Sequence, residues 1–216
     1  MSSEKIWKSL VNNKTLDSDQ VHAFYTQWAK SYDHDMEEIT VIAPKRLSDI
    51  IREHFPSNQR SEALVLDVAA GTGRLGPHLA GIGFKHMDAV DYSQPMLDVL
   101  EKLDLYNKKI CAALGSGRKI PGIEDESYDV VTISGGFCQA HLPIDSLEEV
   151  VRVLKPGGYF FNAMTKYYLE SVDSLHGLEP LMRQMETDGK WLMRARLVQD
   201  HVIGREQGLF HAFQKL

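Results

Sequence analysis

The chain has 216 residues, of which 43% are hydrophobic and 25% charged, as expected for one globular domain that buries a core without disulfides or metal. Its formal net charge of −6 gives no sign of a broad basic surface, so we expect no nucleic-acid partner. Lys108, Lys109, Arg118 and Lys119 could form a local basic patch, but a solvated face is the expected alternative. The N-terminus is too polar for a signal peptide, and no apolar run approaches the about 18–20 residues of a membrane span. We therefore expect a cytoplasmic protein without a membrane partner, and a monomer. The two cysteines have no metal-ligand spacing and are typical of buried free thiols, so no metal is expected.

The first 60 residues predict a helical cap. Residues 1–20 indicate a frayed terminus with a short helical start at most. Residues 19–32 have the spacing of a single helix face, and this face is rich in aromatic side chains. A second helix is predicted over residues 39–54, which Pro56 and the polar residues after it end.

From residue 61 onward, short apolar runs alternate with helical patterns. Strands are predicted over residues 64–66, 86–90, 109–114, 128–133, 159–163, 195–203 and 209–214. Helices are predicted over residues 74–80, 93–103, 145–154 and 167–185. This order indicates an α/β fold with a doubly wound, mostly parallel seven-stranded sheet of the Rossmann-like type. The short connection 204–208 suits a hairpin, so the last strand should be antiparallel. The chain is then one domain, 1–216, with the cap in 1–60 and the core in 61–216.

The turn after the first strand predicts a ligand site. Gly71 and Gly73 stand between that strand and a helix, where backbone N–H groups can approach a ligand closely. Residues 71–76 match the GxGxxG dinucleotide pattern, and Asp91 ends the next strand, where a carboxylate can accept from ribose hydroxyls. Asp67, just before the turn, would repel a pyrophosphate but not a cofactor that carries an ammonium group and a sulfonium. The sequence therefore favours a positively charged adenosine cofactor over NAD.

Four segments carry a family resemblance: LDVAAGTG, DYSQPML, YDVV and LKPGGYFF, in this order and spacing. In them the chain resembles the class I S-adenosylmethionine-dependent methyltransferases. With FYTQWAKSYDHDM near the N-terminus and SGGFCQAHLP after the fourth strand, it is most similar to the Williams–Beuren syndrome region methyltransferase-like proteins. The resemblance implies S-adenosylmethionine as cofactor and S-adenosylhomocysteine as product.

The resemblance also implies a role for each matching residue. The turn beneath the methionine part of the cofactor would be Ala69, Ala70, Gly71, Thr72 and Gly73, with Asp67 near the amino group. Asp91 would hold the ribose, and the adenine would lie against Tyr92 and Met96 and against the edge formed by Leu114, Gly115 and Ser116. Ser134 and Gly135 would border the methionine moiety and the methyl group. The closing helix would contribute Tyr25, Trp28 and Tyr32, with Tyr32 reaching the cofactor carboxylate.

Two positions depart from the family pattern, which often has glycine at Ala69 and an acid at Ser116. Aromatic residues at helical spacing are also typical of simple core packing, an alternative that stays open above all for Trp28.

Methyl transfer to a protonated oxygen or nitrogen nucleophile needs a base within reach. His141, after the fourth strand, is the best candidate by its pKa and position, although a capping or surface histidine before Pro143 is an alternative. No motif indicates a nucleic-acid base or an arginine side chain as acceptor, so a small molecule is expected. The competing hypotheses are a catalytically weak cofactor-binding module that acts through a protein partner, and an NAD-linked oxidoreductase. Residues 166–190 and the connection between the fourth and fifth strands would line the acceptor pocket.

Overall fold

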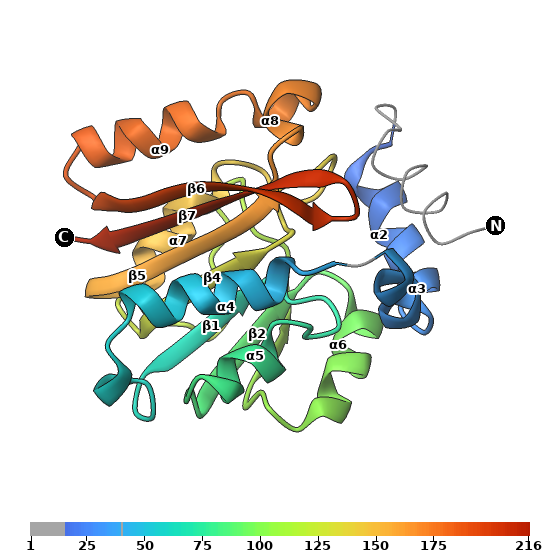
Figure 1. Cartoon of the computed structure of the whole chain (residues 1–216), viewed down its shortest axis with the longest axis horizontal. Helices are drawn as coiled ribbons and strands as arrows, with labels where there is room; N and C mark the ends of the chain where they lie inside the picture. Colours follow the sequence, from blue (N-terminus) through green and yellow to red (C-terminus); the bar gives the residue numbers. More distant parts are fainter. Residues whose placement is uncertain (1–15, 40) are drawn as a thin grey trace.

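The computed structural model describes residues 16–39 and 41–216, so the predicted structure of residues 1–15 lies outside the described chain. A seven-stranded sheet in the order β3-β2-β1-β4-β5-β7-β6 forms its centre (Figure 1). Its strands are β1 Leu64–Val68, β2 His86–Asp91, β3 Lys109–Cys111, β4 Tyr128–Ser134, β5 Leu154–Thr165, β6 Trp191–Ile203 and β7 Glu206–Lys215. Strands β1 to β5 are parallel, and β7 runs antiparallel to both β5 and β6. The predicted fold class and the antiparallel last strand are confirmed.

The order of the strands places a crevice between β1 and β4. The chain runs outward from β1 to β2 and β3, then crosses to β4 on the other side of β1, where Val68 pairs with Ile133. The connections that leave β1 and β4 therefore turn to opposite faces of the sheet. In open parallel sheets, this reversal is where ligands bind, outside the carboxyl ends of the strands.

Helices cover both faces of the sheet, and each face has its own core. One face packs against α4 Ala43–His54, α5 Gly76–Gly81 and α6 Gln94–Leu100, which contribute Leu47, Leu79 and Leu97 to the core. The other packs against α7 Ser146–Val153, α8 Tyr168–Ser171 and α9 Leu178–Thr187. Three short 3-10 helices complete the described elements: η1 Ser57–Gln59, η2 Glu101–Leu103 and η3 Asp173–Leu175. Strands buried on both faces explain the near-continuous apolar runs of β1 and β4.

The N-terminal cap consists of two helices, α2 Ser18–Trp28 and α3 Tyr32–Ile39, which lie beyond the carboxyl ends of the parallel strands (Figure 1). The prediction of one helix over 19–32 was wrong, because the chain turns after Trp28 and restarts at Tyr32. Ser31 stands at this break, where its hydroxyl donates to the Asp35 carboxylate at 3.1 Å. Short polar side chains that bond nearby groups favour helix ends over helix interiors. The second predicted helix, 39–54, corresponds to α4, which begins at Ala43 and so starts four residues later than predicted. Ile39 is instead the last residue of α3.

Other element boundaries also differ from the prediction. The helix predicted from residue 74 begins at Gly76, and the one predicted over 167–185 is divided into α8, η3 and α9. Strand β3 ends at Cys111, short of Leu114, while β5 and β6 begin earlier than predicted. Periodicity finds buried positions, but it does not show where a chain leaves the sheet, because that depends on neighbouring strands.

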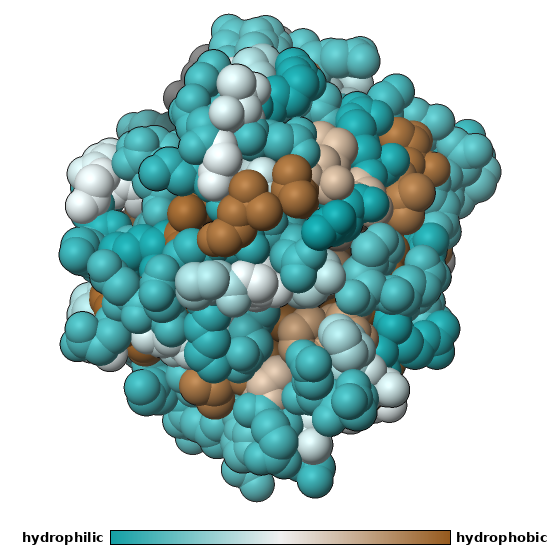
Figure 2. All heavy atoms as spheres, turned by 90° about the vertical axis from the view of Figure 1, so that its left-hand side faces the viewer, coloured by the Kyte–Doolittle hydropathy of each residue, from teal (hydrophilic) through white to brown (hydrophobic). Residues whose placement is uncertain are grey.

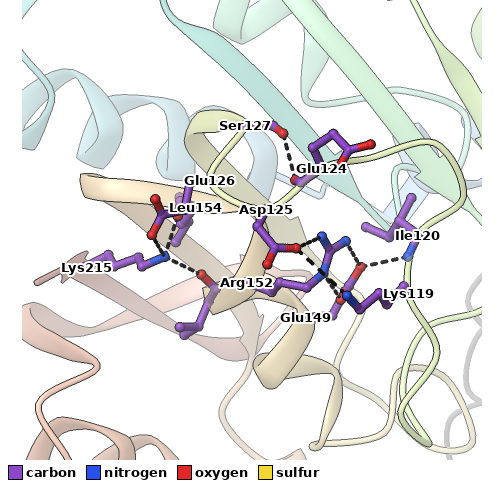
Figure 3. Close-up of polar contacts among 11 residues, drawn as sticks. Lys119, Ile120, Glu124, Asp125, Glu126, Ser127, Glu149, Arg152, Leu154 and Lys215 are labelled. Carbon is purple, nitrogen blue, oxygen red and sulfur yellow. Dashed lines mark hydrogen bonds and ion pairs between the residues drawn. The ribbon is translucent and has the colours of Figure 1, made fainter.

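At the end of the sheet away from the crevice, charged side chains link α7 to the loop before β4 and to β7 (Figure 3). Arg152 of α7 donates to Glu149 at 2.7 Å and to Asp125 at 2.6 Å. These partners hold the pKa of Arg152 above its ordinary value. Lys215 of β7 donates to the carbonyl oxygen of Leu154 at 2.7 Å, which ties the last strand to the end of α7. The molecular face in Figure 2 is mostly hydrophilic, with small separate hydrophobic areas.

The described residues contain neither a membrane-spanning helix nor a cluster of metal-ligating side chains. None of the helices in 16–39 and 41–216 is long and apolar enough to cross a membrane. Over the same residues, no three His, Cys, Asp or Glu side chains are grouped so that they could hold a metal ion.

Candidate active site

A cavity lies at the crevice, between the carboxyl ends of β1, β4 and β5 and the cap helices. Its wall combines the turn after β1 with the segment after β4 and with aromatic side chains from the cap. The predicted site residues that line it are Tyr25, Tyr32, Asp67, Ala69, Ala70, Gly71, Thr72, Ser134, Gly135 and His141. The fold thus brings together residues from four separate parts of the sequence.

The turn after β1 has the backbone conformation that its small residues allow. Ala69 and Gly71 both have positive φ, +55° and +56°. A Cβ atom on Gly71 would meet no atom of the described residues within 4 Å, so these residues leave room for a ligand to approach its backbone. Gly73 differs, because its Cβ would lie 2.8 Å from Leu103 Cδ1 and it does not line the cavity. Gly73 therefore serves the packing of the turn against η2 rather than the cavity wall.

Asp67 is buried at the base of the cavity, with both carboxylate oxygens hydrogen-bonded. Tyr106 donates its hydroxyl to Oδ2 at 2.8 Å, and Thr132 donates to Oδ1 at 2.8 Å. Burial raises the pKa of Asp67 to about 6, against the effect of the two hydrogen bonds, which lower it. Asp67 is therefore mostly ionised at pH 7 and places a negative charge beneath the cavity.

Asp91, at the end of β2, accepts hydrogen bonds from the backbone N–H groups of Gly71 and Ser93, each at 2.8 Å. Burial raises the pKa of its carboxyl group, although both hydrogen bonds lower it. Asp91 does not line the cavity itself. It fixes the glycine turn to the end of the second strand, and each oxygen keeps a lone pair for a further donor.

The residues predicted to surround adenine are not part of this cavity. Tyr92 packs against His22 of α2, with ring centroids 4.2 Å apart, and Met96 and Leu114 are buried. The turn at Gly115 and Ser116 is held by Asp145, whose Oδ2 accepts from the Ser116 N–H at 2.7 Å. Helix α2 of the cap therefore contacts Tyr92, although Tyr92 remains 46% exposed.

The cap contributes Tyr25 and Tyr32 to the cavity, whereas Trp28 lies in the core of the cap. The Trp28 indole donates to Asp35 at 2.6 Å and its ring packs edge-on to Tyr32. Burial raises the pKa of Tyr25 and that of Tyr32, the latter to about 12, so both phenols are protonated at neutral pH. Both hydroxyl groups are therefore hydrogen-bond donors at the cavity.

His141 presents one ring nitrogen without a partner. Its Nδ1 lies 2.6 Å from the carbonyl oxygen of Gln139, which only accepts, so Nδ1 carries the proton. Its Nε2 is buried and has no hydrogen-bond partner among the described residues. Burial lowers the pKa of His141, so the ring is neutral at pH 7. A neutral, unpartnered nitrogen at a cavity is suited to accepting a proton.

Cys138 also lines the cavity but is not suited to act as a nucleophile. Burial alone raises its pKa far above the ordinary value, which disfavours the reactive thiolate.

Several cavity residues were not predicted from the sequence. Arg74 and Met36 lie close to predicted positions, and their location follows only from the packing of the cap on the turn. Met164 lies at the end of β5 and Tyr168 begins α8; of the predicted 166–190 lining, Tyr168 lines this cavity. The GTGR string in the sequence was the one signal that could have indicated Arg74.

Comparison with known proteins agrees with this geometry. Residues 66–162 match a family model described as a methyltransferase domain. The human methyltransferase-like protein 27 is 31% identical over 168 residues, which are 78% of this chain and 66% of that protein. A demethylmenaquinone methyltransferase of Clavibacter sepedonicus is 38% identical over 94 residues, 44% of this chain and 38% of that protein. The chain thus spans just under two thirds of the human relative and less of the bacterial one.

Solved structures share the fold at lower identity. An S-adenosylmethionine-dependent methyltransferase from Aquifex aeolicus superimposes with a TM-score of 0.61 at 21% identity, covering 88% of this chain and 98% of its own. A chain from the complex of the Haloferax volcanii Trm112 methyltransferase activator with a methyltransferase has a TM-score of 0.65 at 18% identity, covering 88% and 97%. The motifs, the strand order and these comparisons agree: the chain belongs to the class I S-adenosylmethionine-dependent methyltransferases.

Proposed function

We propose that this chain transfers a methyl group from S-adenosylmethionine to an oxygen or nitrogen atom of a small molecule, with His141 as the general base. The observation that carries the proposal is the Nε2 atom of His141, which is buried at the cavity without a hydrogen-bond partner in the described chain. A buried polar atom left unpaired is costly, so it indicates a group that is bound during function.

The residues at the turn fit the cofactor. S-adenosylmethionine supplies an activated methyl group on a sulfonium. The open space at Gly71 lets a ligand approach the backbone, and the ionised Asp67 carboxylate favours a positive charge nearby. Asp91 lies at the end of the second strand with lone pairs that can accept from ribose hydroxyls. Burial of these groups excludes water and strengthens their electrostatic interactions.

His141 would act on the acceptor. The hydrogen bond from Nδ1 to Gln139 fixes the tautomer, so the lone pair of Nε2 is free to take a proton from a hydroxyl or amino group. Tyr25 packs edge-on to the imidazole at a centroid distance of 5.0 Å, which fixes the orientation of the ring. Because burial lowers the pKa of His141, the base form is present at neutral pH.

The rest of the cavity wall indicates the nature of the acceptor. The wall includes four apolar side chains from outside the turn: Met36, Val41, Met164 and Ile203. The Tyr168 phenol is also there, and burial raises its pKa, so it is a neutral donor. We therefore infer an acceptor with an apolar body and one protonated nucleophile. A small molecule fits such a wall better than a polar polymer.

Labelled methyl transfer tests the proposal. The protein is incubated with methyl-labelled S-adenosylmethionine and fractionated small-molecule extract, and label is followed into the product. In His141→Asn, the amide can still donate to the Gln139 carbonyl, but the base is lost. We expect turnover to fall by about 10²–10⁴-fold with cofactor affinity nearly unchanged. His176→Asn, on the exposed segment before α9, is the matched control.

Two results would contradict the proposal. Equal turnover in His141→Asn would remove the base from the mechanism. Tight cofactor binding without label in any small-molecule fraction would instead favour a binding module that acts through a protein partner.

A further inference from the structure

We propose that this chain forms a homodimer in which the outer edges of two β6 strands pair antiparallel, centred on Val198. The pairing would continue the central sheet from one copy into the other. The inference goes beyond the proposed function and does not depend on methyl transfer. It replaces the monomer that the sequence alone led us to expect.

Strand β6 is the last strand of the sheet, and β7 is its one neighbour in the described sheet (Figure 1). The middle of β6, residues 196–200, is exposed except for Gln199, which is half-buried. Val198 is 41% exposed and Leu197 36%, so apolar surface is open to solvent here. A row of backbone N–H and C=O groups at an exposed sheet edge is a template for pairing with another strand.

Both ends of this middle stretch are occupied along the outer edge. The Met193 N–H donates to the Glu186 carboxylate of α9 at 2.7 Å. At the other end, the carbonyl oxygen of Val202 accepts from the Ile42 N–H at 2.9 Å. These contacts confine an added strand to the residues between them, which include 196–200.

The alternation of hydrogen bonds along the sheet turns the backbone of Val198 to the outer edge. In antiparallel pairs, successive residues direct their N–H and C=O groups alternately toward one neighbour and toward the other. The Gln207 carbonyl oxygen accepts from Lys166, which follows β5, so the next residue, Gly208, faces β6. Gly208 pairs with Gln199, and Val198 therefore faces away from β7. Two copies joined at Val198 can exchange both N–H···O=C bonds between these residues.

The charged side chains beside Val198 match those of a second copy. With Val198 on the two-fold axis, Arg196 lies opposite Asp200 of the second copy, and the same pair recurs on the other side of the axis. All three project from one face of the sheet, because side chains two residues apart share a face. Arg196 donates to Glu179 through Nε and Nη2, and Asp200 accepts from Gln207 through Oδ1. Within the described chain, Nη1 of the arginine and Oδ2 of the aspartate are left for each other.

This symmetry favours a second copy over an unrelated strand. An edge with charges of one sign repels its own copy, whereas Arg196 and Asp200 stand at equal distances on either side of Val198. One antiparallel pairing therefore produces two ion pairs and a Val–Val contact, each of which stabilises paired strands. Ile203, at the end of β6, lines the cavity, so the dimer would also support this part of the cavity wall.

Analytical ultracentrifugation of the full chain at increasing concentrations tests the proposal. Because the contact is one pair of strands, we expect a reversible dimer with a Kd of about 1–100 µM. Asp200→Arg and Arg196→Asp each place like charges opposite one another twice, so the Kd of each variant alone should rise about tenfold or more. An equimolar mixture of the two variants restores both ion pairs and should form a heterodimer.

Asp188→Arg is the matched control for Asp200→Arg. Asp188 is an exposed residue at the end of α9 that accepts from Gln184 at 2.8 Å, and Asp200 accepts from a glutamine at the same distance. The control should dimerise as the wild type does. Arg196→Asp also loses its contact with α9, so thermal unfolding is measured for every variant. Asp200→Arg alone tests the pairing if Arg196→Asp does not fold.

Disulfide formation tests the register of the pairing. In a hydrogen-bonded antiparallel pair, the facing Cα atoms are about 5.5 Å apart, a separation that a disulfide can span. Val198→Cys, in a Cys111→Ser background, should therefore form a covalent dimer under mild oxidation. Leu192→Cys in the same background should not, although Leu192 is 37% exposed on the same strand.

Three results would overturn the proposal. The first is a wild-type protein that sediments as a monomer at every concentration up to about 1 mM. The second is a dimer that Asp200→Arg leaves intact, because the copies then meet elsewhere. The third is crosslinking through Leu192→Cys but not through Val198→Cys. Absence of methyl transfer in the same preparation would bear on the proposed function alone.

Discussion

Replacement of Tyr106 by Phe should change the pH at which the protein loses its cofactor. Tyr106 donates to the buried Asp67 carboxylate at 2.8 Å from outside the cavity wall. If the Asp67 carboxylate faces the ammonium group of the cofactor, binding requires its ionised form. Because the pKa of Asp67 is about 6, the affinity of the wild type should be constant above pH 7 and should fall as pH decreases below 6.

The expected size follows from the lost hydrogen bond. A hydrogen bond to a charged group contributes about 1.5–3 kcal/mol, and about 1.4 kcal/mol corresponds to one pKa unit. Tyr106→Phe should therefore raise the pKa of Asp67 from about 6 to about 7–8, with Thr132 as the remaining side-chain donor. At pH 7 a smaller fraction of Asp67 is then ionised, and affinity should fall about two- to tenfold.

Calorimetric titration of S-adenosylmethionine between pH 5 and 9 measures this change. Tyr128→Phe is the matched control, because Tyr128 donates to the buried Asp88 carboxylate at the same distance, 2.8 Å, outside the cavity. It should lower the free energy of unfolding without moving the acid limb of binding. An unchanged midpoint in Tyr106→Phe would refute the role given to Asp67.

Two further predictions concern the cap and the far side of the sheet. Thr72→Val removes the hydroxyl that donates to Asp33, so amide hydrogen exchange in residues 18–39 should accelerate while exchange in β4 and β5 stays unchanged. Exchange in the cap as slow as in the wild type would show that this bond does not hold the cap. Glu179 accepts from His211 at 2.9 Å and from Arg196 at 2.7 Å, and these partners lower its pKa from 4.5 to about 2. Since the pKa of Glu179 is lower in the folded state, this stabilisation is present above pH 4.5 and is lost as pH falls toward 2. In Glu179→Gln, the free energy of unfolding should therefore decrease less steeply with falling pH in this range than in the wild type. A limb as steep as that of the wild type would exclude Glu179 as its source.

The motifs of the sequence were sufficient for the class of protein and for the position of the glycine turn after β1. A strand, a turn of small residues and a helix follow one another directly, so residues 64–80 were enough to predict this order of elements. The acid at the end of the second strand is also a local feature. The position of Asp91 at the end of β2 was therefore predicted correctly, although its bond to Gly71 across the turn was not predicted.

The glycine pattern shows where this local reasoning ends. Gly71, Gly73 and Gly76 are the three glycines of one GxGxxG fingerprint in the sequence. In the structure Gly71 faces open space, Gly73 lies against Leu103, and a Cβ atom on Gly76 would lie 2.8 Å from the ring of Tyr106. Gly76 thus allows Tyr106 to reach Asp67. The roles of Gly73 and Gly76 depend on Leu103 and Tyr106, each of which lies 30 positions further along the chain.

By itself, the sequence determined the α/β class, the antiparallel end of the sheet, and the methyltransferase resemblance, because these depend on periodicity and on contiguous motifs. Only the tertiary structure decided which residues meet at the cavity. It separated Trp28, a core residue of the cap, from Tyr25 and Tyr32. Among the described residues it also left His141 Nε2 and Arg74 Nε without a hydrogen-bond partner. Hydrogen-bond satisfaction and burial depend on which distant segments pack together, and no local pattern in the chain records that packing.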